Sequence, residues 1–157
     1  MRDMIARLGS VLAGLLFLAA CGGAPAPPPY HPVADLKQLM ASVVEPAADV
    51  YWDAVGSIVD AKGVLEFSPQ SSEEWDGARN SAYVIAESGN LLMMSPRAKD
   101  AGEWMTLSRA LVDVGQKAIR AAESRDKSGV FDVGAEVYDA CTNCHAKYAV
   151  ELARPGS

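Results

Sequence analysis

The sequence has little positive charge, few cysteines and no sign of a β pattern. Its 157 residues include 14 Lys and Arg against 20 Asp and Glu, which gives a net charge of −6. A chain this acidic is a poor match for nucleic acid or for an anionic membrane surface, so we expect no nucleic-acid partner. No segment alternates apolar and polar residues over a useful length. We therefore expect no β-sheet.

No apolar run is long enough to be a membrane span. The run LGSVLAGLLFLAA at residues 8–20 has only thirteen residues and follows Arg2 and Arg7. It is too short to cross a bilayer and has the length of a signal-peptide core. It ends in LAAC, which resembles a bacterial lipobox. The resemblance implies a lipoprotein signal peptide at 1–20, cleavage after it, and lipid on Cys21. The alternative is an ordinary secretory signal with an incidental cysteine.

A proline-rich segment follows the lipobox. Residues 21–33 contain GGAPAPPPYHP, whose prolines predict an extended tether without a packed core. The remaining residues, 34–154, are enough for one domain. We expect this domain to be held on the periplasmic side of a bacterial membrane. The absence of aspartate after Cys21 favours the outer membrane.

Apolar residues recur at three- and four-residue steps through most of the remaining chain, which predicts four long helices. The first spans about 36–58 and is kinked or restarted at Pro46, because proline lacks an amide hydrogen. The second begins at Ser71, which has the capping-box spacing to Glu74. The third ends at SRDKSG, and the fourth is expected at about 131–152. This pattern predicts an all-α fold, an antiparallel up-down-up-down four-helix bundle.

The stretch YDACTNCHAKY, near the C-terminus, holds two of the three cysteines and one of the two histidines. On a helix, Cys141, Cys144, His145 and Tyr148 fall at i, i+3, i+4 and i+7 and share one face. Cys-x-x-Cys-His is the attachment motif of c-type haem. Each thiol forms a thioether with one vinyl group, and the adjacent imidazole binds the iron. Gly134, on the same helix, is a place where a porphyrin could approach the backbone.

Two other uses of the cysteine pair are less consistent with the sequence. A thioredoxin-like redox pair requires a βαβ context, and no strands are expected here. A zinc site requires a fourth ligand. Cys21 belongs to the lipobox and His31 to the tether, so neither supplies one. Export also suits c-type haem, which is assembled outside the cytoplasm.

The position of the motif on the last helix of a predicted bundle resembles the class II cytochromes c, the cytochrome c′ and cytochrome c556 group. The segments that carry the resemblance are CTNCHAKY at 141–148 and LKQLMASV at 36–43. It implies one covalently attached haem c, with His145 as the proximal iron ligand. One position departs from the family pattern. Cytochromes c′ usually carry Arg or Lys four residues after the haem histidine. Here that residue is Ala149, and the nearest basic residue is Lys147.

Methionines are the candidates for the sixth iron ligand. In the predicted bundle, Met40, Met93, Met94 and Met105 all fall at the end that holds His145. A methionine thioether binds iron and raises the reduction potential, but methionine is also an adaptable core residue. The topology alone does not choose among the four. The resemblance implies Met40, which matches the ligand position of the six-coordinate relatives, with Met93 or Met94 as alternatives.

These observations predict a membrane-anchored mono-haem cytochrome that carries one electron at a time and turns over no substrate of its own. Its partners would be other redox proteins. One alternative is a gas-binding protein with an open sixth site, as in five-coordinate cytochrome c′. Another is a haem subunit of a larger redox complex. The resemblance also implies a homodimer as one oligomeric state, because some class II relatives dimerise through their first two helices.

Overall fold

The computed structural model describes residues 29–149. The chain divides into two units, residues 1–31 and 32–157, and the fold below is that of the second. The predicted signal peptide, the predicted lipidation site Cys21, most of the predicted tether and residues 150–154 lie outside the described residues. Within the described part, no helix combines the length and the apolar character that crossing a bilayer requires.

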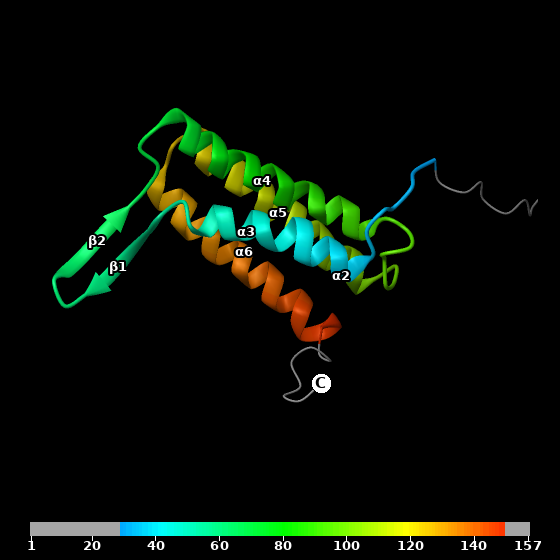
Figure 1. The fold of residues 1–157 in the computed structure, drawn as a ribbon. Coiled ribbons are helices and arrows are strands. Elements are labelled where there is room, and N and C mark those ends of the chain that lie inside the picture. Colours follow the sequence, from blue (N-terminus) through cyan, green and yellow to red (C-terminus); the bar gives the residue numbers. More distant parts are fainter. Residues whose placement is uncertain (1–28, 150–157) are drawn as a thin grey trace, which may run out of the picture. The chain divides into compact units, whose positions relative to one another are not determined.

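The second unit is mostly helical, with one small β-hairpin (Figure 1). Helix α4 packs against α5, α5 against α6, and α3 against both α4 and α6. The elements, in chain order, are α2 (Leu36–Leu39), the π-helix η1 (Met40–Val44), α3 (Glu45–Trp52), β1 (Gly56–Asp60), β2 (Gly63–Phe67), α4 (Ser72–Met93), α5 (Glu103–Glu123) and α6 (Lys127–Tyr148).

The helix starts follow local capping chemistry. The predicted capping box of α4 is confirmed: the Glu74 amide donates to Ser71 Oγ at 3.2 Å, and the Ser71 amide donates to the Glu74 carboxylate at 3.2 Å. A second box, which the sequence analysis missed, starts α2. There the Gln38 amide donates to Asp35 Oδ1 at 2.7 Å, and the Asp35 amide donates to Gln38 Oε1 at 3.0 Å. Each box satisfies amide groups that have no partner inside the helix.

Pro46 explains the change of helix type in the first helical segment. The expected interruption takes the form of the π-helical turn η1, in which the Glu45 amide donates to the Met40 carbonyl, five residues back. Helix α3 then begins with Pro46 in its first turn. A proline costs little at that position, because first-turn amide hydrogens have no intrahelical acceptor.

Residues 53–67 do not fold as the sequence pattern predicted. The first helix ends at Trp52 instead of continuing to Ile58, and β1 and β2 form an antiparallel hairpin with Ile58 opposite Leu65. The turn explains the hairpin. Asp60 Oδ1 accepts the Lys62 amide at 2.7 Å, and Gly63 has a positive φ of 134°. Only glycine adopts that backbone conformation without strain. The expectation of no strand failed because each strand has only five residues, too few for a clear alternation.

Helix α6 also begins earlier than expected, at Lys127 rather than Phe131. The third and fourth helices are separated by Ser124, Arg125 and Asp126, as the SRDKSG break predicted. The predicted end of the fourth helix, Leu152, lies outside the described residues. The additional residues at the start of α6 lie at the opposite end of the helix from Cys141, Cys144 and His145.

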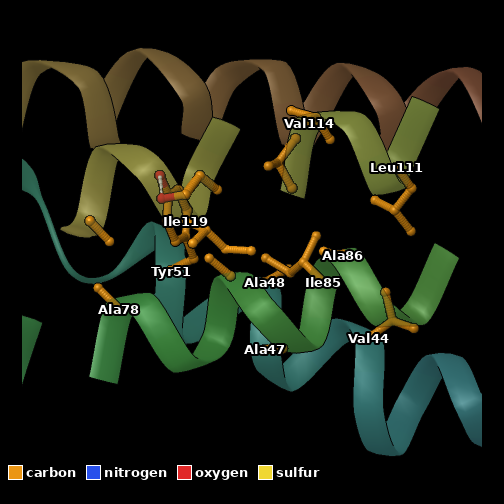
Figure 2. Close-up of a cluster of buried hydrophobic side chains, with 14 of the residues drawn as sticks. Val44, Ala47, Ala48, Tyr51, Ala78, Ile85, Ala86, Leu111, Val114 and Ile119 are labelled. Carbon is orange, nitrogen blue, oxygen red and sulfur yellow. Dashed lines mark hydrogen bonds between the residues drawn. The ribbon is translucent and has the colours of Figure 1, made fainter. Parts of the chain in front are cut away.

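The core lies between α3, α4, α5 and α6, and Figure 2 shows its part between α3, α4 and α5. Ile85 and Ala118 are fully buried, and Trp104 is 1% exposed, as expected for a core tryptophan. Glycines bring α4 and α5 unusually close. A Cβ added at Gly89 would lie 2.6 Å from the Ser108 carbonyl oxygen, and one at Gly115 would lie 2.6 Å from Ala86 Cα. The α4–α5 contact therefore depends on residues without side chains.

Candidate functional site

A cavity of about 390 Å³ collects the residues that the sequence analysis singled out for haem binding. Cys141, Cys144 and His145 line it from α6, and Met40 lines it from η1. The volume falls within the range usual for small-molecule and cofactor sites. Most of the remaining wall is apolar. It comes from Val44 of η1, Ala48 and Trp52 of α3, Leu92 of α4, and Leu107 and Leu111 of α5.

The two cysteines are half-buried free thiols one helical turn apart. Burial raises the pKa of the Cys141 thiol, and the neighbouring Cys144 adds to that rise. Burial also raises the pKa of Cys144. A catalytic dithiol needs the opposite, a lowered pKa that populates the nucleophilic thiolate. The environment of these two thiols is therefore unlike that of a thioredoxin-type redox pair.

His145 is exposed and lines the same cavity. Glu45 and Asp49 are exposed at the same cavity and bring two carboxylates to its border. A flat apolar group could therefore lie against the leucines with its polar edge toward water. This is the usual plan of a cofactor site, in which apolar walls surround a few placed polar groups.

Met40 is the one methionine of the four candidates that lines this cavity. It is half-buried and packs against the core at the first residue of η1. The alternatives Met93 and Met94 lie at the C-terminal end of α4, and Met105 lies in the first turn of α5. None of these three belongs to the cavity wall. The structure thus separates methionines that the predicted topology could only group together.

Ser108 is a cavity residue that the sequence analysis missed. It is 2% exposed, and its Oγ is the one buried side-chain nitrogen or oxygen among residues 29–149 that has no hydrogen-bond partner. The buried serines of α4 behave differently. Ser81 donates to the Ala78 carbonyl at 2.8 Å, and Ser88 donates to the Val84 carbonyl at 2.6 Å. A buried hydroxyl without a partner costs about 1–3 kcal/mol. An occupant of the cavity could remove that cost.

The last turn of α6 is fastened to the start of α5. The Tyr148 hydroxyl donates to Asp100, and the Tyr148 ring meets Trp104 edge to face with centroids 4.9 Å apart. The hydrogen bond with Asp100 raises the pKa of Tyr148 to about 12. The same bond is the main reason why the pKa of Asp100 lies below its ordinary value. Lys147, the nearest basic residue to His145, forms an ion pair with Glu103.

The surroundings of Gly134 and the other cavities bear on where a cofactor could lie. Gly134 is not open to a cofactor, because its carbonyl accepts the Trp52 indole N–H at 2.9 Å and a Cβ there would lie 3.3 Å from the same ring. Two larger cavities, of about 570 and 450 Å³, lie at the base of the hairpin. No cysteine, histidine or methionine lines either of them. Size therefore does not select the site, whereas side-chain chemistry does.

Within residues 29–149, no three His, Cys, Asp or Glu side chains gather closely enough to hold a metal ion by themselves. Comparison with known proteins gave no significant match to a family model, to a curated protein or to a solved structure. The residues of this chain alone therefore carry the functional assignment.

Proposed function

We propose that this protein is a mono-haem c-type cytochrome that carries one electron at a time between other redox proteins. One observation carries the proposal: two cysteines, the adjacent histidine and a methionine from another helix all line one largely apolar cavity. Cys-x-x-Cys-His would supply both covalent attachment points and one ligand to the iron, and the methionine would supply a second ligand.

The residues present fit a haem group. Cys141 and Cys144 would hold its vinyl carbons, and His145 would bind the iron from α6. Met40 would bind the iron from η1, and its soft sulfur would favour the reduced state. When bound, the haem would supply the reversible one-electron change. The leucines of α4 and α5 would exclude water from one side, and Ser108, whose buried hydroxyl has no partner, belongs to the same wall.

We also infer that the four helical segments form an antiparallel up-down-up-down bundle, as in class II cytochromes c. Support comes from the helix contacts and from the short connections at 94–102 and 124–126. Consecutive long helices joined by short loops pack antiparallel. The β-hairpin would then be an insertion between the first and second helices. The position of the cavity near the C-terminal end of α6 agrees with this topology.

Electron transfer is a better account of the site than dithiol chemistry. Burial raises the pKa of both thiols, which disfavours nucleophilic catalysis. Thioether formation during maturation would remove these thiols altogether. We propose no substrate turnover for this chain. The acidic charge and the exposed carboxylates of Glu45 and Asp49 at the cavity favour a basic redox partner.

The proposed location is the periplasmic side of a bacterial membrane, with a lipid anchor on Cys21 and the outer membrane favoured. This part rests on the LAAC stretch and on the proline-rich tether. Such a tether would keep the helical unit near the membrane while leaving its surface free for partners.

The decisive experiment is an absorption spectrum of the purified protein, oxidised and reduced, with and without carbon monoxide. A c-type haem spectrum that barely responds to carbon monoxide is expected for iron ligated by His145 and Met40. Rapid carbon monoxide binding by a high-spin protein would favour the gas-binding alternative. A haem protein that exchanges no electrons with a soluble donor would favour a subunit of a larger complex. A protein without haem would overturn the proposal.

A further inference from the structure

The hairpin β1–β2 has no partner within the described part of the chain. It extends beyond the helices (Figure 1) and forms a sheet of only two strands. Ile58, Val59, Val64 and Leu65 are between 55% and 75% exposed. A two-stranded ribbon is marginally stable in water by itself, and exposed strand edges readily pair with further strands. Apolar exposure on both faces and free edges together indicate an interaction surface.

The register shows which backbone groups face outward. A two-residue turn makes Asp60 and Gly63 the first pair of the ladder, so Ile58 and Leu65 form the next hydrogen-bonded pair. The backbone amides and carbonyls of Val64 and Glu66 must then point away from β1. The outer edge of β2 therefore offers two residues whose backbone groups can pair with a new strand.

We propose that this edge is a homodimer interface in which β2 pairs antiparallel with β2 of a second copy, forming a four-stranded sheet. The charges of Lys62 and Glu66 favour a second copy of this chain as the partner of β2, and they favour one register of the pairing. With the two-fold axis at Val64, Lys62, in the turn directly before β2, would come opposite Glu66 of the second copy, and the reverse pair follows by symmetry. An axis at Leu65 would leave these charges unpaired, and an axis at Glu66 would place two glutamates opposite each other. Opposite charges directly across a ladder stabilise it, and like charges destabilise it.

The hydrogen-bonding pattern agrees with the same register. With the axis at Val64, the outward amide and carbonyl of Val64 would exchange two hydrogen bonds with those of Val64 in the second copy. The pairing would also join Val59 and Val64 of both copies into one apolar stripe. Antiparallel pairing places the two helical units at opposite ends of the new sheet, so they do not collide. A two-fold axis closes the assembly at two copies, whereas pairing β1 with β2 of another copy would continue into a filament.

This interface differs from a dimer through the first two helices, and it does not depend on the haem proposal. The test uses the full chain, purified in detergent, with the protein mass measured by light scattering across a dilution series. We expect a dimer for the wild type. Glu66→Lys should weaken it about tenfold, because two attractive charge pairs become repulsive. The double change Lys62→Glu with Glu66→Lys should restore it.

A matched control is Asp113→Lys, which makes a comparable charge change at an exposed position of α5 and should leave the dimer intact. Val64→Pro should abolish the dimer, since it removes the outward amide at the two-fold axis. Because the hairpin does not form part of the core, circular dichroism should show that each variant keeps its helices. A monomeric wild type, a dimer insensitive to Glu66→Lys, or a charge swap that fails to restore pairing would overturn the proposal.

Discussion

Tyr148 and Trp104 meet with their ring planes at 82°, and this contact joins the last turn of α6 to the first turn of α5 beside His145. The Trp104 indole in turn donates to the Leu92 carbonyl at 2.8 Å, which ties the same cluster to α4. Three helices are thus fixed together next to Cys141, Cys144 and His145. Neither Tyr148 nor Trp104 lines the cavity itself.

The hydrogen bond between Tyr148 and Asp100 predicts a pH dependence of stability. The lowered pKa of Asp100 stabilises the fold above the ordinary carboxyl range, and this contribution is lost as the pH falls through the folded-state value. The raised pKa of Tyr148 affects stability at alkaline pH. Its pKa of about 12 exceeds the ordinary 10.0, so its contribution is complete below pH 10 and is lost as the pH approaches 12.

Tyr148→Phe should remove the alkaline contribution of Tyr148 and keep the packing on Trp104. It should only weaken the acid-side contribution of Asp100, whose carboxylate still accepts from the Gly102 and Trp104 amides. Thermal unfolding followed from acid to strongly alkaline pH would measure this. Tyr83→Phe is the control, because its hydroxyl donates to Glu123 on a different part of the surface. Equal pH profiles for wild type and Tyr148→Phe would show that the bond to Asp100 does not contribute.

Met40→Ala should open the sixth coordination position. We expect loss of the far-red charge-transfer band of methionine-ligated iron, a lower reduction potential, and faster carbon monoxide binding, because no sulfur has to be displaced. Met93→Ala and Met94→Ala are the controls and should change none of the three. If one of these controls opened the site instead, the assignment of Met40 would be wrong.

Covalent attachment should depend on both cysteines of the motif. Haem should remain with the wild-type protein during acid–acetone extraction. Cys141→Ser and Cys144→Ser should each reduce haem incorporation, and the double change should abolish covalent haem. Haem staining of denaturing gels measures the result. Freely extractable haem in the wild type would contradict thioether attachment.

Ser108→Ala tests whether the unpartnered hydroxyl faces the cavity occupant. In haem-free protein, made by changing both motif cysteines, the variant should be as stable as the parent or about 1–3 kcal/mol more stable, because a buried unsatisfied group is removed. In the haem protein that gain should disappear. Ser88→Ala is the control, since it breaks the bond to Val84 in both forms. Identical effects with and without haem would mean that Ser108 makes no contact with it.

Lipidation at Cys21 predicts membrane attachment. Cys21→Ser should release the protein from the membrane fraction or block its maturation, and mass spectrometry of the mature N-terminus should find the lipid on the wild type. A mature chain that begins elsewhere would favour the ordinary secretory signal.

Helix positions and the motif could be predicted from the sequence because their signals are local. Ser71 with Glu74 marks the start of α4, and the spacing of Cys141, Cys144 and His145 puts them on one face whatever the rest of the fold does. The hairpin could not be predicted, because Ile58 continues the helical spacing set by Ala54 and only the Asp60–Gly63 turn and cross-strand pairing override it. Ser108 left no signal either. Its lack of a partner depends on how α5 packs.

The close contact of α4 and α5 decides where the cavity can change its size. Gly89 and Gly115 let two backbones touch, and substituting either would force atoms to within 2.6 Å. Helices α4 and α5, which carry the cavity residues Leu92, Leu107 and Leu111, therefore have little room to shift against each other. Across the cavity, Met40 begins a turn wound with five-residue hydrogen bonds, a geometry rarer and looser than the α-helix. We therefore expect any change in the size of the cavity to come from the side that carries Met40.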